Sequence, residues 1–174
     1  MDGRTGPVPR HHLAWRALLA AHARLTTAVG TALKAADVLS LEAYDVLVAL
    51  AQAGGRLRLS ELAEDVLLTK SGLTRSVDRL EAAGLLRREA CKTDRRVVYA
   101  VLTRKGSAAL ERAWTVYAAE VDRRIGAVLT PAEAETLRDL LDRVGAAALP
   151  PRGLSARGCG PAEHPEEHTA DRPR

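Results

Sequence analysis

The chain has 174 residues, 47% of them hydrophobic and 28% charged, with a formal net charge of +4 at pH 7. This length and apolar content predict one domain with a tail and suffice for a real core. No apolar run of about 18 residues and no signal-peptide pattern is present, so we expect a cytoplasmic protein without a membrane span. Cys91 and Cys159 lie too far apart in the sequence for a disulfide framework or a metal cluster.

The positive charge is concentrated in the middle of the chain. Residues 56–105 hold 12 Lys and Arg against 7 Asp and Glu, which is +5, while the rest of the chain carries −1. Such a local excess indicates a nucleic-acid partner, although a solvated basic surface has the same composition.

Two helices are predicted before this basic block. Residues 1–10 are polar and contain two prolines, which predicts a disordered leader. Over residues 11–36 apolar side chains recur at three- and four-residue steps, as in one long helix. His22 lies on that stripe, where we expect a packed interface histidine rather than a metal ligand. A second helix is capped by Ser40 and should end at Ala53, before two glycines.

The basic block begins with two short helices. Residues 59–66 are predicted to be helical with Ser60 as the N-cap, and only residues 67–68 separate them from the next helix, which is a helix-turn-helix spacing. The next helix covers residues 69–84, with Thr69 as its N-cap and a glycine at its end.

This second helix has one apolar and one polar face. The apolar residues at helical spacing, which we expect to be buried, are Leu73, Val77 and Leu80. The polar residues opposite them are Ser71, Thr74, Arg75 and Asp78. We expect Arg75 and the hydroxyls of Ser71 and Thr74 to contact base edges in the major groove. Thr69 and Lys70 should hold phosphates near the helix N-terminus.

A two-stranded hairpin follows these helices. Residues 85–90 and the alternating, β-branched residues 97–102 are predicted strands, joined by a polar turn over residues 91–96. Residues 56–58 are a candidate short strand against this wing. The predicted fold class is therefore mainly α with a small β-hairpin wing, a winged helix-turn-helix with a DNA-binding core at about residues 40–104.

Two more helices should follow the wing. Thr103 starts a long helix with heptad-like apolar spacing that is expected to reach Leu129. Thr130 and Glu133 form a capping box that starts the last helix. Residues 149–174 are rich in proline and are predicted to be a disordered tail.

The end helices decide the oligomeric state. The apolar stripes of residues 11–36 and 104–148 exceed what a winged helix of about 70 residues needs to cover its own core. They should pack on a second copy as dimerisation helices, within one domain of residues 11–148. A symmetric dimer would place two recognition helices about 34 Å apart, the spacing of palindromic half-sites. A monomer that covers its own core is the alternative.

Several motifs of the central block occur together. They are Leu59-Ser60-Glu61-Leu62-Ala63, Leu73-Thr74-Arg75-Ser76-Val77-Asp78-Arg79-Leu80-Glu81, Gly84-Leu85, Asp94-Arg95-Arg96, and Leu102-Thr103 with Gly106. This combination resembles the MarR family of bacterial transcription regulators, from about Trp15 to about Val144. The resemblance implies the same dimeric arrangement and places an arginine of the wing tip in the minor groove, beside the family's wing acid, Asp94. Because an unused acid would be repelled by phosphate, we assign Asp94 the role of holding Arg96. The predicted DNA contacts are Thr69, Lys70, Ser71, Thr74, Arg75, Arg79, Asp94, Arg95 and Arg96.

The resemblance also implies a small aromatic or anionic effector in a cleft between the dimer helices and the winged helix. Trp15, Tyr44 and Trp114 are candidates for that cleft, and plain core packing is the alternative. The family's peroxide sensors carry a cysteine near the start of the first helix, and this chain has none there. Cys91 lies beside three basic residues, Arg87, Arg88 and Lys92, whose charges would favour a thiolate, so a redox-responsive regulator and an inert exposed thiol are both open.

No catalytic motif is visible, and we predict neither an enzyme nor a cofactor. The loose spacing of Cys159, His164 and His168 is attributed to chance, so no metal site is predicted. The predicted function is a sequence-specific double-stranded DNA-binding transcription regulator, a ligand-responsive repressor that acts as a homodimer. A winged helix used as a protein-interaction module is the competing class, and it would need no basic wing tip.

Overall fold

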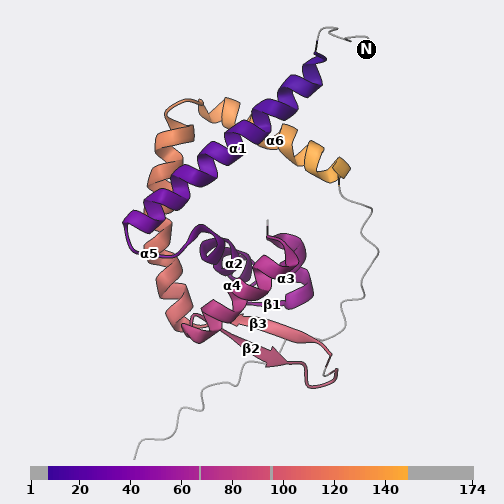
Figure 1. Cartoon of the computed structure of the whole chain (residues 1–174), viewed down its shortest axis with the longest axis vertical. Helices are drawn as coiled ribbons and strands as arrows, with labels where there is room; N and C mark the ends of the chain where they lie inside the picture. The colour runs from indigo at the N-terminus through magenta and orange to yellow at the C-terminus, as the bar shows by residue number, and fades with distance from the viewer. Residues whose placement is uncertain (1–7, 67, 95, 149–174) are drawn as a thin grey trace, which may run out of the picture. The chain divides into compact units, whose positions relative to one another are not determined.

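The computed structural model describes residues 8–66, 68–94 and 96–148. Most of the predicted leader and the whole predicted tail lie outside these ranges. The elements, in chain order, are α1 (Arg10–Ala35), α2 (Leu41–Gln52), β1 (Arg56–Arg58), α3 (Leu59–Asp65), α4 (Lys70–Ala82), β2 (Leu86–Ala90), β3 (Val98–Leu102), α5 (Arg104–Val121), the π-helix η1 (Asp122–Gly126) and α6 (Pro131–Ala148). The predicted class, mainly helical with a small sheet, is confirmed (Figure 1). None of the helices in the described ranges is long and apolar enough to cross a lipid bilayer.

The wing is an antiparallel sheet with the strand order β1-β3-β2. The residues 56–58 pair with β3 as predicted, and Leu57 stands opposite Ala100. On the other side of β3, Ala100 is also opposite Arg88 of β2. Because neighbouring side chains of a strand point to opposite faces, Leu57, Ala100 and Arg88 share the face that packs on the helices.

Two apolar clusters form the core of the part of the chain before α6. The larger one lies between α2, α3, α4 and the sheet, and Leu47, Leu50 and Leu62 in it are fully buried. The smaller one joins α1 to α5, where Leu33 packs near Ala113. In Figure 1 the C-terminal end of α1 crosses α5.

Both ends of α4 are as predicted. The Thr69 hydroxyl accepts a hydrogen bond from the Gly72 backbone N–H at 3.1 Å. At the other end Gly84 adopts φ 71°, and the Leu85 N–H donates to the Leu80 carbonyl at 2.8 Å. A left-handed residue with this backward bond ends a helix firmly, and glycine adopts it without strain.

The start of α3 and the helix-turn-helix connection differ from the prediction. Ser60 is not the N-cap, because β1 runs directly into the helix and the N-cap position is Arg58, whose backbone N–H donates to Glu61 Oε2 at 3.1 Å. The connection covers residues 66–69 rather than residues 67–68 alone. Val66 is already extended (φ −93°, ψ 144°) with a buried side chain, so packing ends the helix before its apolar pattern does.

The long helix after the wing is also shorter than predicted. The α-helix ends at Val121, and the π-helical segment η1 follows it directly. Glu120, just before the change, accepts hydrogen bonds from Arg123 at 2.6 Å and from Arg124 at 2.8 Å. Both arginines hold the pKa of Glu120 below its usual range. Apolar spacing alone does not reveal such a bulge, because the stripe continues through it.

The first turn of α5 is joined to the wing by close contacts. The Thr103 hydroxyl donates to the carbonyls of Gly84 at 2.8 Å and Leu85 at 3.0 Å and caps the helix by accepting from the Gly106 N–H. A Cβ at Gly106 would lie 2.0 Å from the Leu85 carbonyl oxygen, so only glycine fits there.

Candidate nucleic-acid interface

The helix α4 buries one side and exposes the other, as predicted. Leu73, Val77 and Leu80 are buried, and Ser76 is buried with them. The exposed side chains of its polar face are Ser71, Thr74, Arg75 and Asp78. The outward surface of α4 therefore carries hydroxyl, guanidinium and carboxylate groups, and the hydroxyls and Arg75 lie in its first two turns.

One edge of this polar face is basic and borders α2. Arg75 and Arg79, one helical turn apart, line a hollow of about 550 Å³ together with Ser40 and Glu42 at the start of α2. Within the described residues neither arginine has an ion-pair partner at 4.0 Å or less. Their guanidinium groups are thus available to an outside acceptor.

The opposite edge is acidic and borders β2. Arg88 of β2 binds both acids, through Asp78 Oδ1 at 2.5 Å and through the Glu81 carboxylate, which also accepts from the Arg88 backbone N–H at 2.9 Å. These hydrogen bonds hold the pKa of Glu81 below its usual range and raise that of Arg88. The sequence analysis did not single out this cluster, because it joins a helix to a strand seven to ten residues later.

The wing tip places Asp94 beside Arg96. Asp94 Oδ1 accepts from the Arg96 backbone N–H at 3.0 Å and lies 3.6 Å from its Nε. The Arg96 side chain is otherwise 95% exposed. Arg95 and the side chain of Lys70 lie outside the described part of the chain.

Thr69 has a structural task in addition to any ligand contact. Its hydroxyl oxygen already accepts the capping bond from Gly72 and lies 3.3 Å from Ser71 Oγ. The capping bond uses the Thr69 oxygen as an acceptor and leaves its O–H as a donor, so both this hydroxyl and the backbone N–H groups at the start of α4 suit a phosphate.

Cys91 is buried, with only 5% of its surface exposed. The exposure of this thiol considered from the sequence is therefore wrong. Its Sγ lies 3.2 Å from Thr93 Oγ1. The neighbouring arginines are engaged elsewhere: Arg87 pairs with Glu89 at 2.8 Å, and Arg88 binds the acids of α4. Burial and diverted charges both disfavour a reactive thiolate at this position.

Two of the three predicted effector residues meet between α2 and α5. Tyr44 and Trp114 line a mostly apolar hollow of about 360 Å³ with Val48 and Leu110, whereas Trp15 is not among its lining residues. Tyr117 of α5, which was not among the predicted effector residues, stacks on Tyr44 with ring centroids 4.4 Å apart. Burial, with smaller effects of Tyr117 and Asp45, raises the pKa of Tyr44 to about 12, so its hydroxyl stays neutral.

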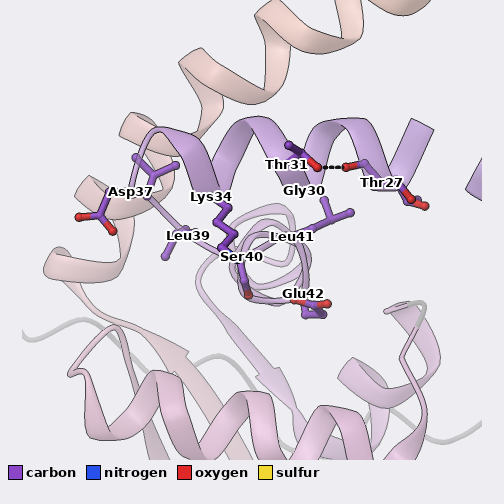
Figure 2. A pocket seen from close by; sticks show the side chains of 11 residues that line it. Thr27, Gly30, Thr31, Lys34, Asp37, Leu39, Ser40, Leu41 and Glu42 are labelled. Atoms are coloured by element: carbon purple, nitrogen blue, oxygen red, sulfur yellow. Dashed lines mark hydrogen bonds between the residues drawn. The ribbon is translucent and has the colours of Figure 1, made fainter. Parts of the chain in front are cut away.

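A second hollow lies at the N-terminal end of α2 and was not predicted. It measures about 580 Å³ between the C-terminal half of α1 and the start of α2. Figure 2 shows Thr27, Thr31 and Lys34 on α1 facing Ser40 and Glu42. The Thr31 hydroxyl donates to the Thr27 carbonyl at 2.8 Å, so the helix backbone already uses that donor.

The combination of a helix-turn-helix, a basic wing and long flanking helices agrees with the comparisons to known proteins. The MarR family profile matches residues 39–97. The crystal structure of AbsC, a MarR family transcriptional regulator from Streptomyces coelicolor, is 31% identical, covers 82% of this chain and 96% of its own, and has a TM-score of 0.72. The chain belongs to the MarR family of transcriptional regulators.

Two further transcriptional regulators are similar to this chain. Sco3205 from Streptomyces coelicolor, solved in complex with DNA, is 29% identical over 86% of this chain and 95% of its own, with a TM-score of 0.75. The HTH-type transcriptional regulator MhqR of Bacillus subtilis (strain 168) is 40% identical over 87 residues. That match spans 50% of this chain and 59% of MhqR, less than two thirds of the relative.

Proposed function

We propose that this MarR family chain is a sequence-specific double-stranded DNA-binding regulator. The observation that carries the proposal is the polar face of α4, exposed beside a hairpin whose tip presents Arg96. A helix with one buried side fits the major groove, and an arginine at the end of a hairpin reaches the adjacent groove. Sco3205, a relative 29% identical, has been solved in complex with DNA, which supports this proposal.

We propose the individual contacts from the sequence pattern and, for the described side chains, from the exposed face of α4 and the wing tip. Arg75 reads base edges with Ser71 and Thr74, and Arg79 contacts phosphates from the same basic edge. The backbone at Thr69 and the charge of Lys70 hold phosphates at the helix N-terminus. Asp94 orients Arg96, and Arg95 joins it at the minor groove.

We further propose that the regulator is a homodimer on a palindromic operator. Apolar side chains of α1 and α6 are exposed in the single chain, including Leu13 and Trp15 on α1 and Leu140 and Val144 on α6. Apolar stripes of this length are ordinarily covered by a partner. A second copy covers them symmetrically and repeats α4 about 34 Å along the duplex.

The hollow between α2 and α5 is the proposed effector site, and the effector makes this regulator a ligand-responsive repressor. Its lining is mostly apolar and includes the Trp114 ring, the neutral side chain of Tyr44 and one carboxylate, Glu111, which suits a small aromatic molecule better than an anionic one. A thermal-shift screen of phenolic compounds tests this assignment, because a ligand of the folded state raises the melting temperature. The variant Trp114→Ala should lose the shift, and a shift that persists in it would place the ligand elsewhere.

Selection of duplexes from a random-sequence pool tests DNA binding directly. We expect the full-length chain to enrich a palindrome with half-sites about one helical turn, or roughly 34 Å, apart. Sedimentation should give two chains per enriched duplex. Binding to none of the duplexes would favour the protein-interaction module considered from the sequence, and equal binding to all of them would overturn the proposed sequence specificity.

A further inference from the structure

The exposed face of α4 has two edges of opposite charge. Arg75 and Arg79 form the basic edge beside α2, and Asp78 and Glu81 form the acidic edge beside β2. An acidic edge on a helix that enters a groove would face phosphates of the same sign. The acidic edge would therefore weaken the proposed DNA binding unless its charge is compensated.

Arg88 is the group that meets both acids. Its two terminal nitrogens bind different carboxylates, Nη2 to Asp78 at 2.5 Å and Nη1 to Glu81, while its backbone N–H holds the second Glu81 oxygen at 2.9 Å. Arg88 is only 30% exposed, whereas the Asp78 side chain is 57% exposed. The guanidinium is therefore less exposed than the Asp78 carboxylate, and it holds both acids on the side of α4 that borders β2.

We propose that Arg88 is a charge-compensating positioning residue, which keeps the acidic edge of the recognition helix from repelling DNA. The inference rests on the DNA binding proposed above. Arg88 contacts no base in this role. It changes the charge of the edge from −2 to −1 and fixes the two carboxylates against β2, away from the groove.

If Arg88 compensates charge, one variant should bind DNA more tightly than the unaltered chain. If Arg88 only clamps the structure, the same variant should bind DNA more weakly. In Asp78→Asn/Glu81→Gln the edge becomes positive, because Arg88 remains. Compensation predicts binding to a random 30-base-pair duplex that is tighter than that of the unaltered chain, on the order of fivefold for unit charges near phosphates in water. A structural clamp predicts weaker binding, since its hydrogen bonds are lost.

Rescue gives a second readout. Arg88→Met leaves two uncompensated acids and should weaken binding on the order of tenfold, both to the random duplex and to a duplex selected by the unaltered chain. Combining Arg88→Met with Asp78→Asn/Glu81→Gln makes the edge neutral and should restore most of that affinity. Melting temperatures of all variants, measured alongside, report any loss of folding.

Arg87→Met is the matched control. Arg87 is the preceding residue of β2 and also pairs with a carboxylate, Glu89 at 2.8 Å, but it points to the other face of the sheet. Its loss should leave DNA affinity within about twofold, as for an exposed pair.

Each outcome is decisive. Tighter binding by Asp78→Asn/Glu81→Gln together with rescue of Arg88→Met supports the inference. Weaker binding by Asp78→Asn/Glu81→Gln, which does not depend on whether Arg88→Met folds, overturns the inference alone. If the unaltered chain binds neither duplex, the proposed function fails and this inference fails with it.

Discussion

The winged helix and the end helices differ in how completely a single chain buries their apolar residues. In the winged helix Leu47 and Leu50 are fully buried between α2, α4 and the sheet. In the end helices Trp15 is 57% exposed and Leu140 is 49% exposed. The winged helix buries its core within a single chain, whereas the end helices leave apolar side chains exposed. The same apolar periodicity therefore contributes to folding in the winged helix and, on our proposal, to association in the end helices.

The largest effect is expected from charges placed on the exposed apolar side of α6. Changing Leu140 and Leu141 together to Asp puts charges into the proposed interface and should abolish both dimerisation and specific DNA binding, because one half-site offers too few contacts. Sedimentation and fluorescence anisotropy measure the two effects. The control, Arg143→Asp with Ala146→Asp, adds acids away from the apolar side and should remain dimeric. A folded monomer that still binds operator DNA specifically would refute the proposed dimer.

A cavity in the buried core of the winged helix should destabilise the folded chain. Leu50→Ala should lower the free energy of unfolding by about 2 to 5 kcal/mol, since Leu50 is fully buried and its neighbours can collapse only partly. Denaturant titration measures this loss. Val128→Ala, at a position 74% exposed, should cost less than about 0.5 kcal/mol. Similar losses at the two positions would mean that burial within one chain does not separate the regions.

A loss confined to DNA recognition is expected at Arg75. Arg75→Ala should cost about 1 to 3 kcal/mol on the selected duplex and much less on a random one, because a base contact is lost. Folding should be unchanged, since the side chain is exposed. The exposed Arg112 of α5 gives a control, Arg112→Ala, which should bind as the unaltered chain does. Equal losses on both duplexes would show that Arg75 touches only phosphate.

The smallest effects are expected at the wing tip. Arg96→Ala should weaken binding to every duplex and lower the salt dependence by about one unit per subunit, while the preference at central bases stays intact. Asp94→Ala should resemble it, although removing an acid would by simple electrostatics strengthen binding. Affinities measured over a range of salt concentrations check both variants. Tighter binding by Asp94→Ala would show that Asp94 does not orient Arg96.

The local elements of this chain could be predicted because their signals are local. Thr69 and Gly84 mark the ends of α4 through bonds to residues within five positions, and the structure has those bonds. Ser60 misled the prediction because Ser is a good N-cap, but the strand before it set the helix start. The π-helix after Val121 left no trace in the apolar spacing.

The helix-turn-helix, the wing and the polar face of α4 could be predicted from the sequence, since periodicity and capping act over one or two turns. Which side chains meet across elements depends on the tertiary structure. It brought Arg88 to Asp78 and Tyr117 to Tyr44, buried Cys91 and left Trp15 exposed. Such contacts depend on how strands and helices pack, and packing sums many small apolar contacts between residues distant in the chain.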